Sequence, residues 1–324
     1  MRRNLQHSNV FRPSGRLIYS ERFPCMTSPA PPTAAGTLRR AYAAWIVVCL
    51  VWGTTYLGIR IALETIPPLL MAGLRWVCAG SILLAALRLR GVPVPGRTSW
   101  PALALIGVLM TTFGNGAVVW AEQTIPSGLA ALLVAAVPFW MVGVERFMPN
   151  PDRVNVARVA GLLVGFTGIV LLVWPELTHP AGAGVLAGVL STQLACIGWA
   201  IGSSYSRRRH ANENVIASAA VQMLFGGGVL LVAGLLIGEG PRLAFNPRTA
   251  FALGYLVLAG SIAAFSAYLY ALKHLPVATV SLYAYVNPVI AVLLGTVLLD
   301  EPFSPRLALA GAVVLVGMVL VRRS

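Results

Sequence analysis

Long apolar runs separated by short polar breaks dominate the chain from about residue 42 onward. A helix needs about 20 apolar residues to cross roughly 30 Å of hydrocarbon, and Pro or Gly marks nearly every break between the runs. The pattern therefore predicts an all-α integral membrane protein with ten transmembrane helices. They are expected at about 42–62, 68–88, 101–121, 127–145, 156–174, 183–204, 214–238, 249–270, 276–298 and 305–321.

Residues 1–41 contain no apolar run of spanning length and are rich in Arg, Pro and Ser. This composition predicts a disordered, basic cytoplasmic tail, and the lack of a central apolar region argues against a cleaved signal peptide. Met26 opens a short, natural lead into the first span. The pattern leaves open whether Met1 or Met26 is the true start.

An internal repeat divides the spans into two halves, 42–174 and 183–321. The matched positions include Pro126 with Pro276, Trp120 with Tyr270, Pro138 with Pro288 and Gly161 with Gly311. Because five spans form each half, the second half would enter the membrane from the opposite side. Inverted repeats are typical of secondary transporters, which bind substrate near mid-membrane at the repeat interface. The alternative is that helices rich in Leu, Ala and Gly align loosely by composition alone.

Composition supports a membrane protein and changes how the charge is interpreted. Of the 324 residues, 57% are hydrophobic and 10% are charged, against roughly 25% charged in soluble domains. The net charge of +14 would fit nucleic-acid binding, but most basic residues lie in short loops between the apolar runs. That is the positive-inside pattern. We therefore expect a lipid bilayer and a small-molecule substrate as partners, and no nucleic acid.

The loop charges also predict an orientation. With a cytoplasmic N-terminus, the outer segments hold few basic residues, namely Arg60, Arg242, Arg248 and Arg306. Most of the others fall in the inner segments, including the run 207–209. Since Lys and Arg are enriched in cytoplasmic loops, both termini are expected in the cytoplasm.

The chain resembles the EamA family of the drug/metabolite transporter superfamily, and within it the YedA-like exporter branch. The resemblance is carried by WGTTYLGIRIALETIPPLLMAGLRWVCAG (Trp52–Gly80) and GNGAVVWAEQTIPSGLAALLVAAVPFW (Gly114–Trp140). It covers nearly all of 42–321 and implies a ten-helix permease of the bacterial inner membrane that exports a small metabolite or drug-like solute. The second half departs at polar positions, with Gln222 for Arg75 and Phe265 for Asn115, so a polar site would be asymmetric.

Aromatic and polar residues at helical spacing are the candidates for substrate binding. Trp52, Tyr56 and Arg60 share one helical face at i, i+4 and i+8, which could line a path for an amphipathic or anionic solute. For Arg60 the alternative is snorkelling to the outer headgroups. The predicted substrate-binding residues are Trp52, Thr55, Tyr56, Arg75, Asn115, Trp199, Gln222 and Tyr285.

Arg75 lies about seven residues into the second span, roughly 10 Å deep at 1.5 Å per residue. An unpaired cation at that depth is costly, so Arg75 is expected to pair with an acid, either Glu64 or Glu122. It would then form a structural or gating ion pair, or contact an anionic substrate. Snorkelling alone is the alternative.

Glu122 is the candidate for coupling, and it shares a helical face with Asn115 seven residues earlier. Desolvation raises the pKa of a carboxyl and a nearby Arg lowers it, so a balanced carboxyl could exchange a proton and couple transport to a proton gradient. The alternative is a loop-end Glu in the outer interface. The predicted coupling or gating residues are Glu122, Gln123, Glu64 and Arg60.

Proline inside a span removes a backbone donor and clashes with the preceding turn, so Pro138 and Pro288 are predicted to kink their helices. Matched kinks would suit helices that bend during alternating access. Small and hydroxylated faces in the sixth and ninth spans suit close packing or pore lining equally.

Motifs for other chemistry are missing from the sequence. It contains no G-x-x-x-x-G-K-[ST] phosphate loop, no Ser/His/Asp, HExxH or CxxC signature, and no Cys or His at metal-ligand spacing. Asp300 and Glu301 are expected to be isolated, solvated loop acids. The sequence therefore predicts no catalytic residue, no metal and no cofactor.

The residues together predict a secondary active transporter that exports a small solute by alternating access, as a monomer or homodimer, with proton coupling as a hypothesis. One rival is an uptake or exchange permease for a sugar-type metabolite. A rival of another class is a lipid flippase, which needs a lateral opening between helices, or an intramembrane enzyme, which needs a buried nucleophile or metal cluster.

Overall fold

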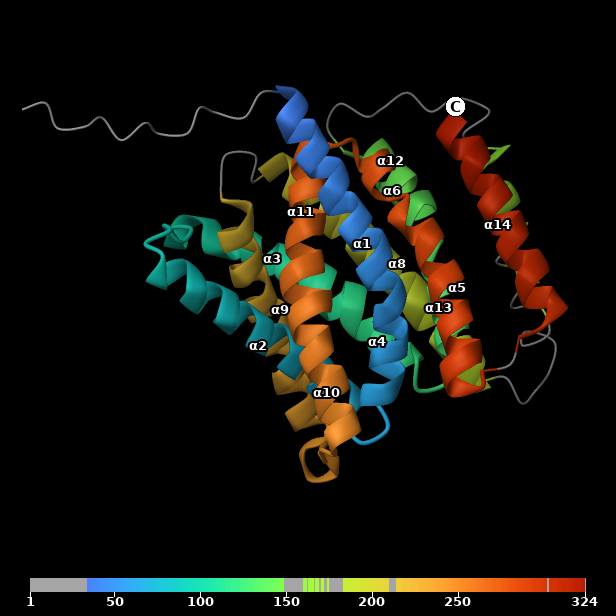
Figure 1. The fold of residues 1–324 in the computed structure, drawn as a ribbon, viewed down its shortest axis with the longest axis horizontal. Coiled ribbons are helices and arrows are strands. Elements are labelled where there is room, and N and C mark those ends of the chain that lie inside the picture. The colour runs from blue at the N-terminus through green and yellow to red at the C-terminus, as the bar shows by residue number, and fades with distance from the viewer. Residues whose placement is uncertain are drawn as a thin grey trace, which may run out of the picture.

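The computed structural model describes residues 34–148, 183–209, 214–301 and 303–323, and residues 160–174 in part. Every regular element in these ranges is helical (Figure 1). Seven of the described helical stretches are long and apolar enough to cross a membrane, and two shorter apolar stretches, Tyr283–Leu299 and Ala308–Gly317, follow in the second half. The span expected at 156–174 lies largely outside the described residues.

The helices follow the predicted spans closely where the structure describes them. They are α1 (Ala34–Ala62), α2 (Pro68–Leu89), α3 (Trp100–Gly107), α4 (Ala117–Ala121), α5 (Ser127–Val134), α6 (Val137–Arg146), α8 (Ala183–Arg209), α9 (Val215–Leu236), α10 (Pro247–Tyr255), α11 (Ala264–His274), α12 (Val277–Val280), α13 (Tyr283–Leu299) and α14 (Pro305–Arg323).

The first helix begins earlier than the sequence predicts. The disordered tail expected over 1–41 is wrong for 34–41, because α1 already starts at Ala34. The segment 34–41, AAGTLRRA, has one large apolar residue, but six of its eight residues are Ala, Leu or Arg, which are strong helix formers. A hydropathy criterion therefore places the start of the helix too late.

Helices from the two halves alternate in space and do not form two separate bodies (Figure 1). Helix α1 packs on α11 and α13, α2 packs on α9, and α8 packs on α4 and α6. The start of α1 and the C-terminus lie at the same end of the bundle (Figure 1). We call this the near end and the opposite one the far end.

Two π-helical segments, Val108–Gly116 and Leu256–Ala263, interrupt the predicted third and eighth spans. Each lies between two α-helical pieces, α3 and α4 in the first half and α10 and α11 in the second. Such segments occur frequently at functional sites. Here the carbonyl oxygen of Gly260 accepts a hydrogen bond from Trp52 Nε1 at 3.0 Å, which joins the second π-helical segment to α1.

Two carboxylates cap helices at the far end. Glu301 accepts hydrogen bonds from Ser127 N at 2.9 Å, Ser127 Oγ at 2.8 Å and Gly128 N at 3.2 Å, and Glu239 accepts from Leu70 N at 2.8 Å. The first turn of a helix leaves N–H donors unsatisfied and favours negative charge. The expectation that Glu301 is isolated and solvated is therefore wrong, because its carboxylate ties the end of α13 to the start of α5.

The two prolines with predicted kinks lie in different settings. Pro138 is near the start of α6, directly after an interruption of the helix at residues 135–136. Pro288 lies inside α13, and the interruption in that stretch comes earlier, at residues 281–282.

Candidate functional site

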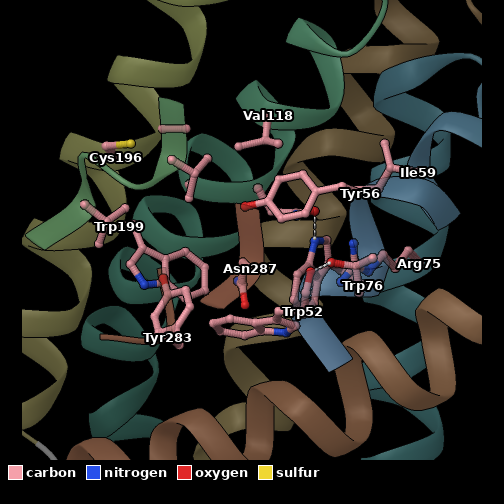
Figure 2. A pocket seen from close by; sticks show the side chains of 16 residues that line it. Trp52, Tyr56, Ile59, Arg75, Trp76, Val118, Cys196, Trp199, Tyr283 and Asn287 are labelled. Carbon is pink, nitrogen blue, oxygen red and sulfur yellow. Dashed lines mark hydrogen bonds between the residues drawn. The ribbon is translucent and has the colours of Figure 1, made fainter. Parts of the chain in front are cut away.

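A cavity of about 60 Å³ lies between the two halves of the chain, and its side chains are shown in Figure 2. Its lining comes from α1, α2, the first π-helical segment and α4 to α6 on one side, and from α8 and α13 on the other. One water needs about 10–15 Å³ of such space, whereas ligand pockets usually measure about 300–1,000 Å³. The helices must therefore separate before the cavity admits a drug-sized solute.

One wall of the cavity is aromatic. The ring of Trp52 lies edge-to-face with Trp199, at a centroid distance of 5.3 Å, and with Tyr283, at 4.9 Å. Trp199 Nε1 donates to the hydroxyl of Tyr268 at 3.0 Å, and Tyr268 in turn shares a hydrogen bond with Ser203 Oγ at 2.8 Å. Edge-to-face packing and satisfied polar atoms hold these rings in place, so they offer a fixed apolar surface.

The opposite side of the cavity is polar, with Arg75 and Trp76 facing Trp199 and Tyr283 across it (Figure 2). Arg75 Nε donates to Ser261 Oγ at 2.8 Å, and its guanidinium carbon lies 4.8 Å from the centroid of the Trp76 ring. Arg75 is only 2% exposed, and its Nη1 has no hydrogen-bond partner. A full positive charge is thus buried beside the cavity.

The ion pair predicted for Arg75 is wrong for both expected acids. Glu64 instead pairs with Arg248 at 3.1 Å, and both side chains are exposed at the far end. Glu122 makes no hydrogen bond through either carboxylate oxygen. Arg75 instead donates to the hydroxyl of Ser261 and lies over the Trp76 ring.

Glu122 lies just beyond the cavity at the far end. It follows Val118, a lining residue, by one helical turn, and its side chain is fully buried. Arg60 Nη1 donates to its main-chain oxygen, so this arginine neighbours the acid without pairing with the carboxylate. A carboxyl without hydrogen-bond partners in an apolar setting is costly in its charged form.

Most predicted substrate-binding residues meet in the cavity, namely Trp52, Thr55, Tyr56, Arg75, Asn115 and Trp199. Two do not. Gln222 lines a separate cavity of about 30 Å³ with Arg207 and Lys273 toward the near end, because α9 turns this side chain away from the halves' interface. Tyr285 lies with Pro288 in an apolar groove between α13 and α14.

The remaining predicted coupling residue, Gln123, is exposed, and its amide nitrogen donates to Trp120 O at 3.1 Å. Within the described ranges no group of three His, Cys, Asp or Glu side chains is placed to hold a metal ion.

Sequence reasoning missed Trp76, Tyr283 and Asn287, which also line the cavity. Trp76 Nε1 donates to Asn115 Oδ1 at 2.8 Å. With its amide oriented to match donors with acceptors, Asn287 donates to the main-chain oxygens of Tyr283 at 3.1 Å and Cys49 at 2.9 Å. The i, i+4 spacing of Tyr283 and Asn287 places both on one helical face, and this spacing could have indicated that they line the same cavity.

The sequence model described as "EamA-like transporter family" matches residues 39–174 and, a second time, residues 186–323. The chain is 39% identical to the inner membrane transporter YedA of Escherichia coli strain K12 over 285 residues, which are 86% of this chain and 90% of YedA. It is 22% identical to the transporter YoaV of Bacillus subtilis, over 85% of this chain and 94% of YoaV. One crystal structure at 24% identity aligns with a TM-score of 0.66 over 87% of this chain and 98% of that chain, which indicates a common fold.

Proposed function

This chain belongs to the EamA-like transporter family, and on that premise we propose that it is a secondary active transporter of the bacterial inner membrane. It exports a small metabolite or drug-like solute by alternating access. Its ten transmembrane helices form two inverted five-helix repeats, and both termini lie in the cytoplasm. The repeated family match and the paired π-helical segments support this arrangement.

The cavity between the halves carries the proposal. Its lining is drawn from both halves, as in repeat-built secondary transporters, where substrate binds at the repeat interface. The aromatic wall and the buried Arg75 give it both an apolar surface and a charge. Movement of one half against the other would widen the cavity and open it to one side of the membrane at a time.

Coupling to protons is assigned to Glu122. Its carboxyl is fully buried with both oxygens unpartnered, so neutralisation by a proton removes the cost of burying a charge. When the far end opens, water reaches the carboxyl and the charged form becomes tolerable. A proton bound in one conformation and released in the other would drive solute movement against its gradient.

Replacing Glu122 by Gln should abolish the response of transport to an imposed pH gradient, because the amide cannot bind or release a proton. Solute exchange at equal pH should persist. The measurement is solute flux in proteoliposomes, compared between an imposed pH gradient and equal pH. Inverted and right-side-out membrane vesicles would separate export from uptake.

Glu64→Gln is the matched control, since the Glu64 carboxylate lies in an exposed ion pair. Its transport should respond to the pH gradient as that of the parent does. If Glu122→Gln retained the full pH response, coupling through this carboxyl would have to be given up.

A further inference from the structure

The guanidinium of Arg75 has hydrogen-bonding capacity that the protein does not use. The side chain is 2% exposed, and Nη1 has no partner although Nε donates to Ser261 Oγ at 2.8 Å. Leaving a buried charged donor unsatisfied costs more than the net gain from a typical hydrogen bond. Among the described residues, no carboxylate forms an ion pair with Arg75. The free donor therefore points to an acceptor that arrives with a ligand.

The surroundings of Arg75 hold the guanidinium in one place. The ring of Trp76 lies against it, with 4.8 Å between the guanidinium carbon and the ring centroid. Gly260 leaves space for it, since a Cβ there would lie 3.0 Å from Arg75 Nη2. Ser261 accepts from Nε and Gly260 lies beside Nη2, so Nη1 is the nitrogen left for a ligand. The planar donor fork of a guanidinium matches carboxylate oxygens.

The far wall of the cavity offers the complementary surface. Trp199 and Tyr283 lie opposite Arg75, and Trp52 lies between the two sides (Figure 2). Aromatic walls attract both flat apolar rings and organic cations. The buried positive charge of Arg75 repels a cation, so the combination favours a flat ring that carries a negative group.

A second, separate cavity within the second half is positively charged. It lies toward the near end and is lined by Arg207, Lys273 and Gln222. Positive side chains at the mouth of a cleft raise the local concentration of anions and speed their association. Its place on the proposed cytoplasmic side suits a solute that leaves the cell.

From these contacts we propose that the cavity between the halves binds an aromatic carboxylate, with the carboxylate on Arg75 and the ring against Trp52, Trp199 and Tyr283. This inference rests on the proposed transport function and names the class of solute. The ring and the carboxylate engage opposite walls of the cavity, so the ligand bridges helices of the two halves.

Ligand-induced thermal stabilisation of the purified full chain in detergent tests the proposal, with three probes that share one ring: naphthoate, the uncharged naphthamide and the cationic naphthylmethylammonium. Naphthoate should raise the melting temperature and bind at least about tenfold more tightly than the other two, as a charge-assisted fork implies. Arg75→Gln should remove this preference. Arg75→Lys keeps the positive charge but lacks the planar donor fork, so it should retain part of the preference for naphthoate. This variant keeps the proposal testable if Arg75→Gln fails to fold. Arg248→Gln, an exposed arginine at the far end, should behave as the parent.

Three outcomes would overturn the proposal: no stabilisation by naphthoate, equal or tighter binding of the amide or the cation, or a carboxylate preference that survives Arg75→Gln. The assay contains no membrane gradient, so its result is independent of coupling. If Glu122-dependent flux is seen only for an uncharged solute, the proposed transport function holds and the aromatic carboxylate as its substrate is wrong. If naphthoate binds tightly but no gradient-driven flux occurs, the binding site holds and the proposed transport function is wrong.

Discussion

The Gly227→Leu variant should yield no folded protein, whereas the Gly228→Leu variant should fold as the parent does. Gly227 lies where α9 meets α2, and a Cβ there would be 2.7 Å from Trp76 Cβ and 2.9 Å from Val77 N. A Cβ at Gly228 meets nothing within 4 Å. Small residues let membrane helices approach closely, and the packing gained in this way drives their association.

The α2–α9 contact cannot make room for a leucine, because main-chain atoms form it along its length. A Cβ at Gly73 would lie 2.7 Å from Leu231 N, and one at Gly80 would lie 2.9 Å from Ala220 O. Overpacking costs about 1–3 kcal/mol when neighbouring side chains can shift. Here a whole helix must move, so the cost should consume most of a typical stability of about 5–15 kcal/mol.

Size-exclusion profiles of fluorescently tagged variants after mild detergent extraction measure this effect. Parent and Gly228→Leu should give one sharp peak, and Gly227→Leu should appear in the void volume or be lost. A sharp Gly227→Leu peak with the parental melting temperature would contradict the tight α2–α9 contact.

The positions of the helices were predictable because their signals are local. Apolar runs broken by Pro and Gly place the starts of α2 at Pro68 and α5 at Ser127, as expected from 68–88 and 127–145. The same rule misplaces the start of α1, since its first residues form helix through propensity and not through hydrophobicity.

The site was predictable where helical phase is regular. Trp52 and Tyr56 face the cavity together because α1 runs through both without a break. In the ninth predicted span the interruption at residues 281–282 resets the phase. After it, Tyr283 and Tyr285 are two residues apart on α13 and face nearly opposite sides, so Tyr283 lines the cavity and the predicted Tyr285 lies in the groove beside α14. A periodicity argument carries no information across such a break.

Contacts between distant segments could not be read from the chain. Glu301 and Ser127 are 174 residues apart, and neither has a local neighbour that indicates the other. The partners of Arg75 show the same limit. Depth in the span correctly required a partner, but Ser261 lies 186 residues away, and only the packing of α2 on the second π-helical segment brings it within reach.

Replacing Glu301 by Gln should loosen the far end and expose the cavity. The carboxylate accepts two main-chain hydrogen bonds and one hydroxyl hydrogen bond at the start of α5, whereas an amide has one accepting oxygen and brings donors of its own. Hydrogen bonds to charged groups contribute about 1.5–3 kcal/mol each. Glu301 joins α13 of the second half to α5 of the first. Losing these hydrogen bonds should therefore destabilise the conformation in which the halves are closed at the far end.

The thiol of Cys196 reports the change, since it lines the cavity and is 1% exposed. In a Cys25→Ser, Cys49→Ser, Cys78→Ser background, Cys196 is the one thiol left of the four in the sequence. There, maleimide labelling of purified Glu301→Gln protein should be on the order of tenfold faster than that of the parent, as a loss of about 1.4 kcal/mol would give. Asp300→Asn is the matched control, because Asp300 is exposed with a φ of 52° and Asn tolerates that left-handed conformation. It should label at the parental rate. Equal labelling of Glu301→Gln and the parent would show that the tie between α13 and α5 does not hold the far end closed, and that closure depends on apolar packing of these helices alone.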